Sequence, residues 1–329
     1  MNERNIPRRR ILALAASGAA ASALPALGQT DAYPSKPVKL ITGFAVGGPS
    51  DVIARAIGQA LSSELGQPVV VDNRTGAAGV VGMDAVTNST PDGYTIGLLA
   101  NTTTTALHFA NKTLDLANRA VPVGRFVSTR IVLVVNPQKV PARTLPELVE
   151  YLRQHPGTPL TSAGYGGLGH LGLELFAQEQ KIKIVHVPYR GSAPALADVI
   201  AGQVSGMVVD VSSVISHIQA GKVIPIAVVS EERVPSLPNV PTALELGYKS
   251  LQIDSSMGIV LPPKTPQPVV NRLRAALKRA VESEFYTDAA AKAGNARFFE
   301  DAPVYRTWME KDFARWGDVI RTANIKAPA

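Results

Sequence analysis

The chain has 329 residues, of which 46% are hydrophobic and 18% charged, and it contains no cysteine. This composition is typical of a globular protein long enough for two ordinary domains. The lack of cysteine excludes disulfides, thiolate metal sites and a cysteine nucleophile. The formal net charge is +7, but no run of Lys or Arg occurs beyond the first ten residues, so the sequence shows no footprint of nucleic-acid binding.

The N-terminal segment has the pattern of a secretory signal. Three arginines at positions 8–10 precede the alanine-rich run ILALAASGAAASALPAL, which leads into a small-x-small motif at residues 26–28. The apolar run is too short to span a bilayer. We therefore predict that residues 1–28 are a signal peptide of the Sec or twin-arginine type. Its removal lowers the net charge to +4 and implies a periplasmic protein, the alternative being a basic N-terminus on a cytoplasmic one.

Short β-rich runs alternate with amphipathic ones along most of the chain. The predicted strands are residues 38–43, 68–73, 94–99, 131–136, 182–187, 206–211 and 223–229. Two long helices are predicted at the C-terminus, over residues 266–285 and 302–323, and Trp308, Phe313 and Trp316 in the second are expected in the core. Alternation of strands and helices is typical of βαβ units, so we predict an α/β fold with parallel-rich sheets flanked by helices.

Three glycine-rich turns connect predicted strands to predicted helices. They are FAVGGPSD at residues 44–51, GAAG at residues 76–79 and SAGYGGLGHL at residues 162–171. In the first, Ser50 or Asp51 is expected to cap the following helix. Helix N-termini offer free N–H groups and a positive dipole end, which suit carboxylate or phosphate. A tight packing turn is an equal alternative for any one loop, but several such loops together favour an anion site.

The third loop also fits G-x-G-x-x-G, the dinucleotide-binding fingerprint, through Gly164, Gly166 and Gly169. A dinucleotide site needs an acidic residue at the end of the next strand, where this chain has PYRG at residues 188–191. Neither G-x-S-x-G nor H-E-x-x-H occurs. We therefore predict no catalytic residue, no metal and no cofactor, with a nucleotide-using or hydrolytic enzyme as the alternative.

Several single polar residues are further candidates. His170 begins a predicted helix, where a neutral imidazole either supports the loop or contacts a ligand. Asp210 ends a predicted strand, where open α/β sheets place ligand groups, or it caps the next helix. Tyr189 and Arg190 lie at another strand end, and Arg190 either pairs with a distal carboxylate or is solvated. Thr102 follows the strand at residues 94–99, and we expect its hydroxyl in a cleft.

Motifs along the whole chain after residue 28 resemble those of one protein family. The motifs include YPSKPVKLITGFAVGGPSDVIAR, LGQPVVVDNRTGAAG, SAGYGGLGHL and VHVPYRGSAPALADVIAGQV. Their order resembles that of the solute-binding receptors of tripartite tricarboxylate transporters, the Bug or TctC-type proteins. The resemblance implies a two-lobed periplasmic binding fold with the ligand between the lobes. Residues 29–131 and 253–329 would form lobe 1, and residues 132–252 would form lobe 2.

The resemblance also implies a function. Such a receptor captures a small carboxylate, for example a dicarboxylate, a tricarboxylate, an amino acid or an aromatic acid, and presents it to membrane transporter subunits in a transient contact. It is expected to act as a monomer and without a cofactor. A ligand-sensing subunit for a membrane signalling partner is the alternative.

Backbone amides of two loops bind the carboxylate in the family that this chain resembles. The ligand-binding residues predicted on this basis, together with the single candidates, are Val46, Gly47, Gly48, Pro49, Ser50, Asp51, Thr102, Ala163, Gly164, Tyr165, Gly166, His170, Tyr189, Asp210 and Ser256. Ser256 stands where relatives often place an aromatic residue, so a roomier or more polar pocket is expected there. Residues 45–46 and Tyr165 also depart from the family pattern.

Overall fold

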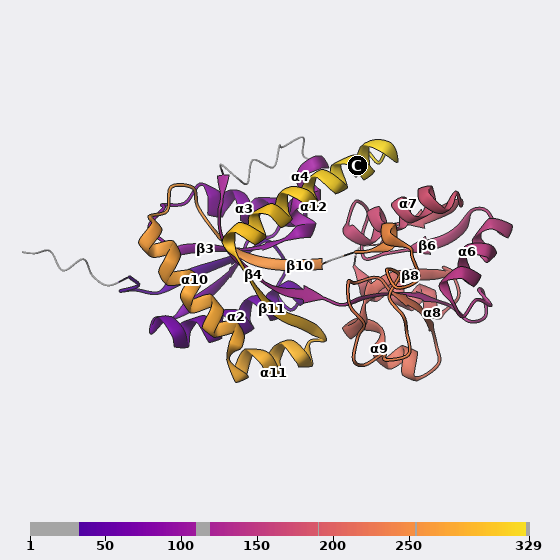
Figure 1. The fold of residues 1–329 in the computed structure, drawn as a ribbon, viewed down its shortest axis with the longest axis horizontal. Helices are drawn as coiled ribbons and strands as arrows, with labels where there is room; N and C mark the ends of the chain where they lie inside the picture. The colour runs from indigo at the N-terminus through magenta and orange to yellow at the C-terminus, as the bar shows by residue number, and fades with distance from the viewer. Residues whose placement is uncertain (1–32, 110–118, 190, 254, 327–329) are drawn as a thin grey trace, which may run out of the picture.

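The computed structural model describes residues 33–109, 119–189, 191–253 and 255–326. They form two lobes, each built on one mixed β-sheet (Figure 1). In order across the sheet, the strands of lobe 1 are β11 (Asn295–Asp301), β4 (Val121–Thr129), β10 (Ser255–Leu261), β3 (Thr95–Ala100), β1 (Val38–Thr42) and β2 (Val69–Asn73). Those of lobe 2 are β7 (Ile184–Val187), β6 (Thr158–Thr161), β8 (Gly206–Asp210), β5 (Ile131–Val135) and β9 (Ile224–Val228).

Helices cover both faces of the lobe 1 sheet. The helices and turns of this lobe are α2 (Pro49–Leu65), η2 (Ala77–Gly79), α3 (Val80–Thr87), α4 (Asn101–Phe109), α10 (Gln267–Glu282), α11 (Glu284–Lys292) and α12 (Ala302–Thr322). On one face, Ile57 of α2 and Leu273 of α10 pack with Leu40 and Phe126 of the sheet. On the other face, α3 and α12 contribute to a second cluster that includes Met309. Burial of these apolar surfaces is the main stabilising contribution.

The sheet of lobe 2 is also covered on both faces. Its helices are α6 (Leu145–Gln154), α7 (Leu168–Gln180), α8 (Ser192–Ile200), α9 (Val211–Gln219) and the short η3 (Lys249–Leu251). Leu148 of α6 and Phe176 of α7 pack with Leu133 of β5. Val199 of α8 and Val214 of α9 belong to a separate cluster on the opposite face. The N-terminal ends of α7, α8 and α9 all follow strands of this sheet.

The chain crosses between the lobes from β4 to β5 and again from η3 to β10. Helix α12 also contacts both lobes (Figure 1). Its Met309 packs in lobe 1, whereas Trp316 is fully buried in the core of lobe 2. Arg315 of the same helix donates hydrogen bonds to the carbonyl oxygens of Ser250 and Gln252, at 3.3 and 2.7 Å. The lobes are therefore joined by two strand connections and one helix.

The predicted α/β architecture is confirmed, and all seven predicted strands are present with ends shifted by at most two residues. Three further strands, β4, β10 and β11, are not predicted by the sequence pattern, and β6 corresponds to a run, PLTSA at residues 159–163, that is only weakly strand-like. The sheets are more mixed than expected, because β4, β10, β11 and β5 each make antiparallel pairs. The helix predicted over residues 266–285 ends at Glu282, because Ser283 caps a new helix by accepting the Tyr286 N–H at 3.2 Å.

The predicted signal peptide at residues 1–28 lies outside the described residues. Within the described part of the chain, no helix combines the length and the apolarity needed to cross a membrane.

Candidate functional site

A cavity of about 520 Å³ lies between the two lobes. Its volume is in the range of small-molecule binding sites. Lobe 1 lines it with Ala77, Ala78, Thr102, Ala106, Phe109 and Ser255. Lobe 2 lines it with Ile131, Ser162, Ala163, Gly164, Tyr165, Gly166, Gly167, Leu168, Gly169, Ser192, Val208, Val209 and Asp210.

The lobe 2 loop, residues 162–167, connects β6 to α7 and supplies much of the cavity wall. Gly167 is the N-cap of α7, and the first helical hydrogen bond runs from the Leu171 N–H to the Gly167 carbonyl oxygen. The N–H groups of Leu168 and Gly169 precede that bond and have no acceptor among the described residues. They lie at the positive end of the helix dipole. This wall of the cavity therefore suits an anion.

Two glycines allow the lobe 2 loop to adopt this conformation. Gly166 has a positive φ of 72°, and a Cβ there would lie 2.8 Å from the ring of Phe109 in α4. A Cβ on Gly169 would lie 2.7 Å from the Cβ of Ser162. Since real side chains do not approach that closely, both positions require glycine. The Phe109 ring also means that lobe 1 packs directly against the loop.

His170 supports the lobe 2 loop from behind. Its side chain is buried, does not line the cavity, and accepts the Gly166 N–H at Nδ1 over 3.0 Å. An Nδ1 that accepts is unprotonated, so the ring hydrogen is placed on Nε2, which is 3.6 Å from Glu174. Of the two roles considered for His170, this placement favours the structural one.

A serine and a histidine meet beside the cavity. Ser162 Oγ lies 2.9 Å from His186 Nε2, and the His186 ring stacks on His170 with ring centroids 4.0 Å apart. Burial, together with the neighbouring His170, lowers the pKa of His186 to about 3. Its Nδ1 has no hydrogen-bond partner among the described residues. Among the described residues, no third group orients this imidazole as in a Ser-His-Asp triad.

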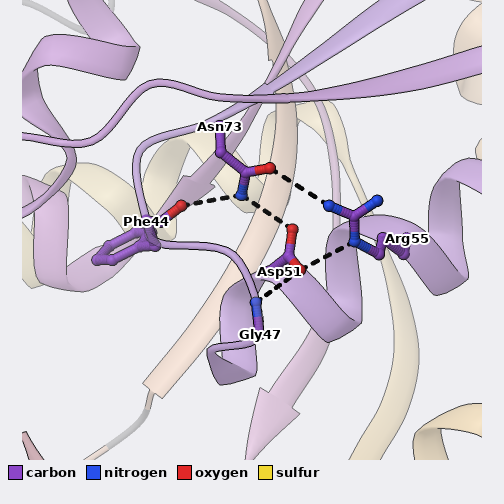
Figure 2. Close-up of polar contacts among 5 residues, drawn as sticks. All are labelled: Phe44, Gly47, Asp51, Arg55 and Asn73. Atoms are coloured by element: carbon purple, nitrogen blue, oxygen red, sulfur yellow. Dashed lines mark hydrogen bonds and ion pairs between the residues drawn. The ribbon is translucent and has the colours of Figure 1, made fainter.

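The lobe 1 loop, residues 43–48, connects β1 to α2, and side chains of α2 and β2 hold its backbone (Figure 2). Asp51 accepts hydrogen bonds from the Gly47 N–H, Arg55 Nε and Asn73 Nδ2, each at 2.9 Å. Asn73 Nδ2 also donates to the Phe44 carbonyl oxygen at 2.9 Å. The bond from Arg55, with those from Gly47 and Asn73, lowers the pKa of the buried Asp51 to about 2.

This geometry corrects the expected start of α2. The N-cap is Gly48, with Pro49 in the first helical position, so neither Ser50 nor Asp51 caps the helix. Asp51 stands in the third helical position and reaches back to Gly47. Proline is common at the first helical position because it lacks the N–H that would otherwise be left without a partner.

The six residues predicted from the first loop, Val46, Gly47, Gly48, Pro49, Ser50 and Asp51, do not line the cavity in this conformation. Val46 is 70% exposed. The lobe 1 wall is formed instead by Ala77 and Ala78, which have positive φ values of 46° and 51°. The Thr103 hydroxyl donates to the Ala78 carbonyl oxygen at 3.1 Å and holds this turn against α4.

Thr102, Ala163, Gly164, Tyr165, Gly166 and Asp210 are brought together around the cavity, as the sequence predicts for a ligand site. Tyr189 lies elsewhere, because its hydroxyl donates to Asp198. That bond and burial raise the pKa of Tyr189 to about 12. The predicted pairing residue Arg190 lies outside the described residues.

Ser256 is also outside the cavity wall. It is buried, accepts a hydrogen bond from Arg125 Nη1 at 3.2 Å, and donates its N–H to Asn101 Oδ1 at 3.2 Å. Its neighbour Ser255 lines the cavity. Successive side chains of a strand point to opposite faces, so the choice between the two depends on a strand that the sequence does not reveal.

Asp210 ends β8 and is the N-cap of α9, but its carboxyl makes no side-chain capping bond. Burial raises its pKa to about 6. Among the described residues that line the cavity there is no Lys, Arg or His. Within the described part of the chain, no group of three His, Cys, Asp or Glu residues is placed to hold a metal ion.

Comparison with known proteins identifies the family. The model of the tripartite tricarboxylate transporter family receptor, TctC, matches residues 53–325. The chain belongs to this receptor family. Protein BugT of Bordetella pertussis is 31% identical over 96% of this chain and 98% of BugT. A TctC solute-binding protein from Polaromonas, solved without ligand, superposes with a TM-score of 0.77 at 27% identity, over 88% of this chain and 99% of that one.

A third relative was solved with a ligand. It is R. palustris Rpa4515 with adipate, which superposes with a TM-score of 0.75 at 29% identity, over 89% of this chain and 99% of that protein. The predicted Bug/TctC resemblance is therefore confirmed, and this chain is a periplasmic solute-binding protein of the TctC type. The family is one of receptors rather than enzymes.

The sequence pattern does not mark several of the residues that line the cavity as ligand-binding. The turn at residues 76–79 is a glycine-rich turn before a helix, but its pattern does not mark Ala77 and Ala78 as ligand-binding. Ser162 belongs to the third glycine-rich turn and Ser192 precedes a helical pattern, but the sequence marks neither as ligand-binding. The apolar wall, which includes Phe109, Ile131 and Val208, carries no sequence signal, because its residue types are those of any core.

Proposed function

We propose that this receptor captures a small carboxylate between its two lobes and delivers it to the membrane subunits of a tripartite tricarboxylate-type transporter. The observation that carries the proposal is the pair of N–H groups of Leu168 and Gly169 at the cavity wall, which have no acceptor in the part of the chain that the structure describes. Hydrogen bonds to a charged group contribute about 1.5–3 kcal/mol each. Several such bonds, with an apolar wall, supply the ~8 kcal/mol of micromolar binding.

The proposal includes the cellular setting and the lobe limits. Residues 1–28 direct export and are removed, and the mature chain works in the periplasm as a monomer. The proposed limits are residues 29–131 and 253–329 for lobe 1 and residues 132–252 for lobe 2, so that Ile131, the first residue of β5 in the lobe 2 sheet, stands at the boundary. Lobe closure brings the lobe 1 loop toward the ligand, so its exposed Val46 would contact the ligand only in the closed form.

The first experiment is thermal unfolding of ligand-stripped mature protein with a panel of carboxylates, and with NAD and ATP as controls. A ligand at 100 times its dissociation constant adds about 2.7 kcal/mol, which raises the unfolding midpoint by about 5 °C. We expect this shift with carboxylates alone. A shift with NAD or ATP and none with carboxylates would contradict the proposal.

A pair of proline variants tests the amide wall directly. Leu168→Pro removes one N–H at the first position of α7, where the helix tolerates proline and where the extended backbone of Gly167 suits a following proline. Glu284→Pro is the matched control, at the first position of α11, away from the cavity. We expect Leu168→Pro to weaken carboxylate binding by at least about tenfold and Glu284→Pro to leave it unchanged. If both variants bind the carboxylate with equal affinity, the Leu168 N–H is not part of the binding site.

A ligand-sensing subunit for a membrane signalling partner has the same capture step. The two functions differ in the fate of the captured carboxylate, so uptake of the identified carboxylate by cells lacking this receptor distinguishes them. Loss of uptake supports transport.

A further inference from the structure

Asp210 places a carboxyl group in the wall of a cavity that binds, on the proposed function, a carboxylate. Its backbone is firmly held. Asp210 pairs with Ile131 in the β8–β5 ladder, and the next N–H, that of Val211, donates to the Arg130 carbonyl oxygen at 2.9 Å. Ile131 is the first residue of β5 after the chain crosses from lobe 1. The carboxyl is therefore fixed on the side of the cavity where the lobes join.

No group of the described residues neutralises this carboxyl. Its only hydrogen bond within the described residues is to its own backbone N–H. The other described residues that line the cavity include no cation, and Tyr165 is the one further ionisable side chain among them. A carboxyl group that lacks a hydrogen-bond donor in such a cavity favours ligands that supply a donor. It disfavours ligands that do not, because their binding would remove water from the carboxyl without replacing its hydrogen bonds.

The surrounding wall is apolar. Ile131 and Val208 lie beside Asp210 on lobe 2, and Ala106 and Phe109 contribute from lobe 1. These side chains suit a hydrocarbon or aromatic body and offer nothing to a second anionic group. The described wall also carries the hydroxyl groups of Thr102, Ser162, Tyr165, Ser192 and Ser255. Its two elements with an electrostatic sign are opposite: N–H groups at the positive end of α7, and an anionic oxygen at the end of β8.

We propose that Asp210 makes this receptor selective for monocarboxylates that carry a hydrogen-bond donor, a hydroxyl or an ammonium group, on an apolar body, and that it rejects dicarboxylates. The ligand's carboxylate binds the amide wall, and its donor binds Asp210. A dicarboxylate would bring a second negative charge to Asp210 at close range, where like charges repel strongly. Since the pKa of Asp210 is about 6, the residue is mostly ionised at pH 7.5.

The test uses two matched ligand series measured by calorimetry at pH 7.5 with the mature protein. The first is hexanoate, 6-hydroxyhexanoate, 6-aminohexanoate and adipate. The second is benzoate, 4-hydroxybenzoate, 4-(aminomethyl)benzoate and terephthalate. Within the series that binds, we expect a donor-bearing acid to bind at least about tenfold more tightly than both the unsubstituted acid and the dicarboxylate. Comparison of the hydroxyl acid with the amino acid in each series shows which hydrogen-bond donor Asp210 prefers.

Asp210→Asn and Asp318→Asn complete the test. Asp318 is exposed on α12 and pairs with Arg321, so its substitution controls for loss of one charge. We expect Asp210→Asn to lose the preference, with donor-bearing acids weakened and dicarboxylates strengthened by at least about tenfold, and Asp318→Asn to behave as the wild type. The proposal is overturned if the wild type prefers the dicarboxylate, or if Asp210→Asn leaves the ratio unchanged. Failure of the proposed function is a different result, in which no carboxylate of either series or of the broad panel binds.

Discussion

The two glycine-rich loops that precede α2 and α7 look alike in sequence and differ in the side chain that accepts the glycine N–H. In the lobe 1 loop, the Gly47 N–H is bonded to the carboxylate of Asp51, which lies in the first turn of the helix that the loop precedes. In the lobe 2 loop, the matching Gly166 N–H is bonded to the imidazole of His170, and the first turn of α7 has no acidic residue.

The difference shows that the two helix N-termini carry different charges of their own. Asp51 places a negative charge at the positive end of the α2 dipole, and Arg55 and Asn73 hold it there (Figure 2). The first turn of α7 has no acidic residue, so its positive end suits the carboxylate of a ligand. Three predictions test this comparison.

Asp51→Ala should have the largest effect, because it leaves the donors Gly47 and Asn73 without their common acceptor. We expect the free energy of unfolding to fall by about 3 kcal/mol. Because the pKa of Asp51 is lowered to about 2, its contribution is complete above the unfolded-state pKa of about 4 and is lost as the pH falls toward 2. Urea denaturation at pH 7 and pH 3 measures both effects.

Asp72→Ala is the matched control, since Asp72 pairs with Lys39 and Arg74 at a partly exposed position. A surface pair of this kind contributes less than about 1 kcal/mol. Carboxylate affinity should be nearly unchanged in folded Asp51→Ala protein. A loss of binding in that variant would show that the lobe 1 loop contacts the ligand after all.

Gly166→Ala should have an intermediate effect, because the new Cβ meets both an unfavourable backbone conformation and the Phe109 ring. Gly157→Ala is the matched control, with a φ of 87° and no atom within 4 Å of the added Cβ. We expect the control to lose about 1 kcal/mol of stability and Gly166→Ala about 2 kcal/mol, with weaker carboxylate binding in Gly166→Ala alone. If the two variants have the same unfolding free energy in denaturation and the same carboxylate affinity in calorimetry, the Phe109 ring moves away from the new Cβ without cost.

Asp210→Asn should have the smallest effect on stability, and one that depends on pH. Burial raises the pKa of Asp210 to about 6, above the value of about 4 in the unfolded chain. The folded protein then holds the proton more tightly, so the wild type loses stability as the pH rises from about 4 to above 6. We expect Asp210→Asn to be more stable than the wild type at pH 8, and the difference to disappear near pH 4. A constant difference across this range would contradict the raised pKa.

The sequence predicts strands that contain clusters of Val, Ile or Leu, and misses those whose pairing depends on distant segments. β10 begins with two serines and contains Gly258, whose added Cβ would lie 2.5 Å from the Tyr305 ring. β11 lies at the edge of the sheet and is polar along much of its length. Neither has the composition of a buried strand, and both are fixed by pairing with β4.

The site is predictable where local chemistry decides it and is missed where the tertiary arrangement does. The lobe 2 loop and Asp210 stand at element ends that face the cavity, and the sequence pattern marks both. It does not show that Asp51 turns inward to Gly47, or that Tyr189 bonds to Asp198. Those hydrogen-bond partners depend on which side chains the fold brings close together, and a short sequence motif does not carry that information.

The position of β10 imposes an order on how the molecule assembles. The strand lies between β3 and β4 in the lobe 1 sheet, yet it is made only after all of lobe 2. Until residues 255–261 arrive, β3 and β4 each present an open edge, while the five strands of lobe 2 are already complete. We therefore expect that a chain that ends at residue 252 does not form a complete lobe 1 sheet. The N-terminal strands of lobe 1 reach their native pairing only when the last quarter of the sequence is present.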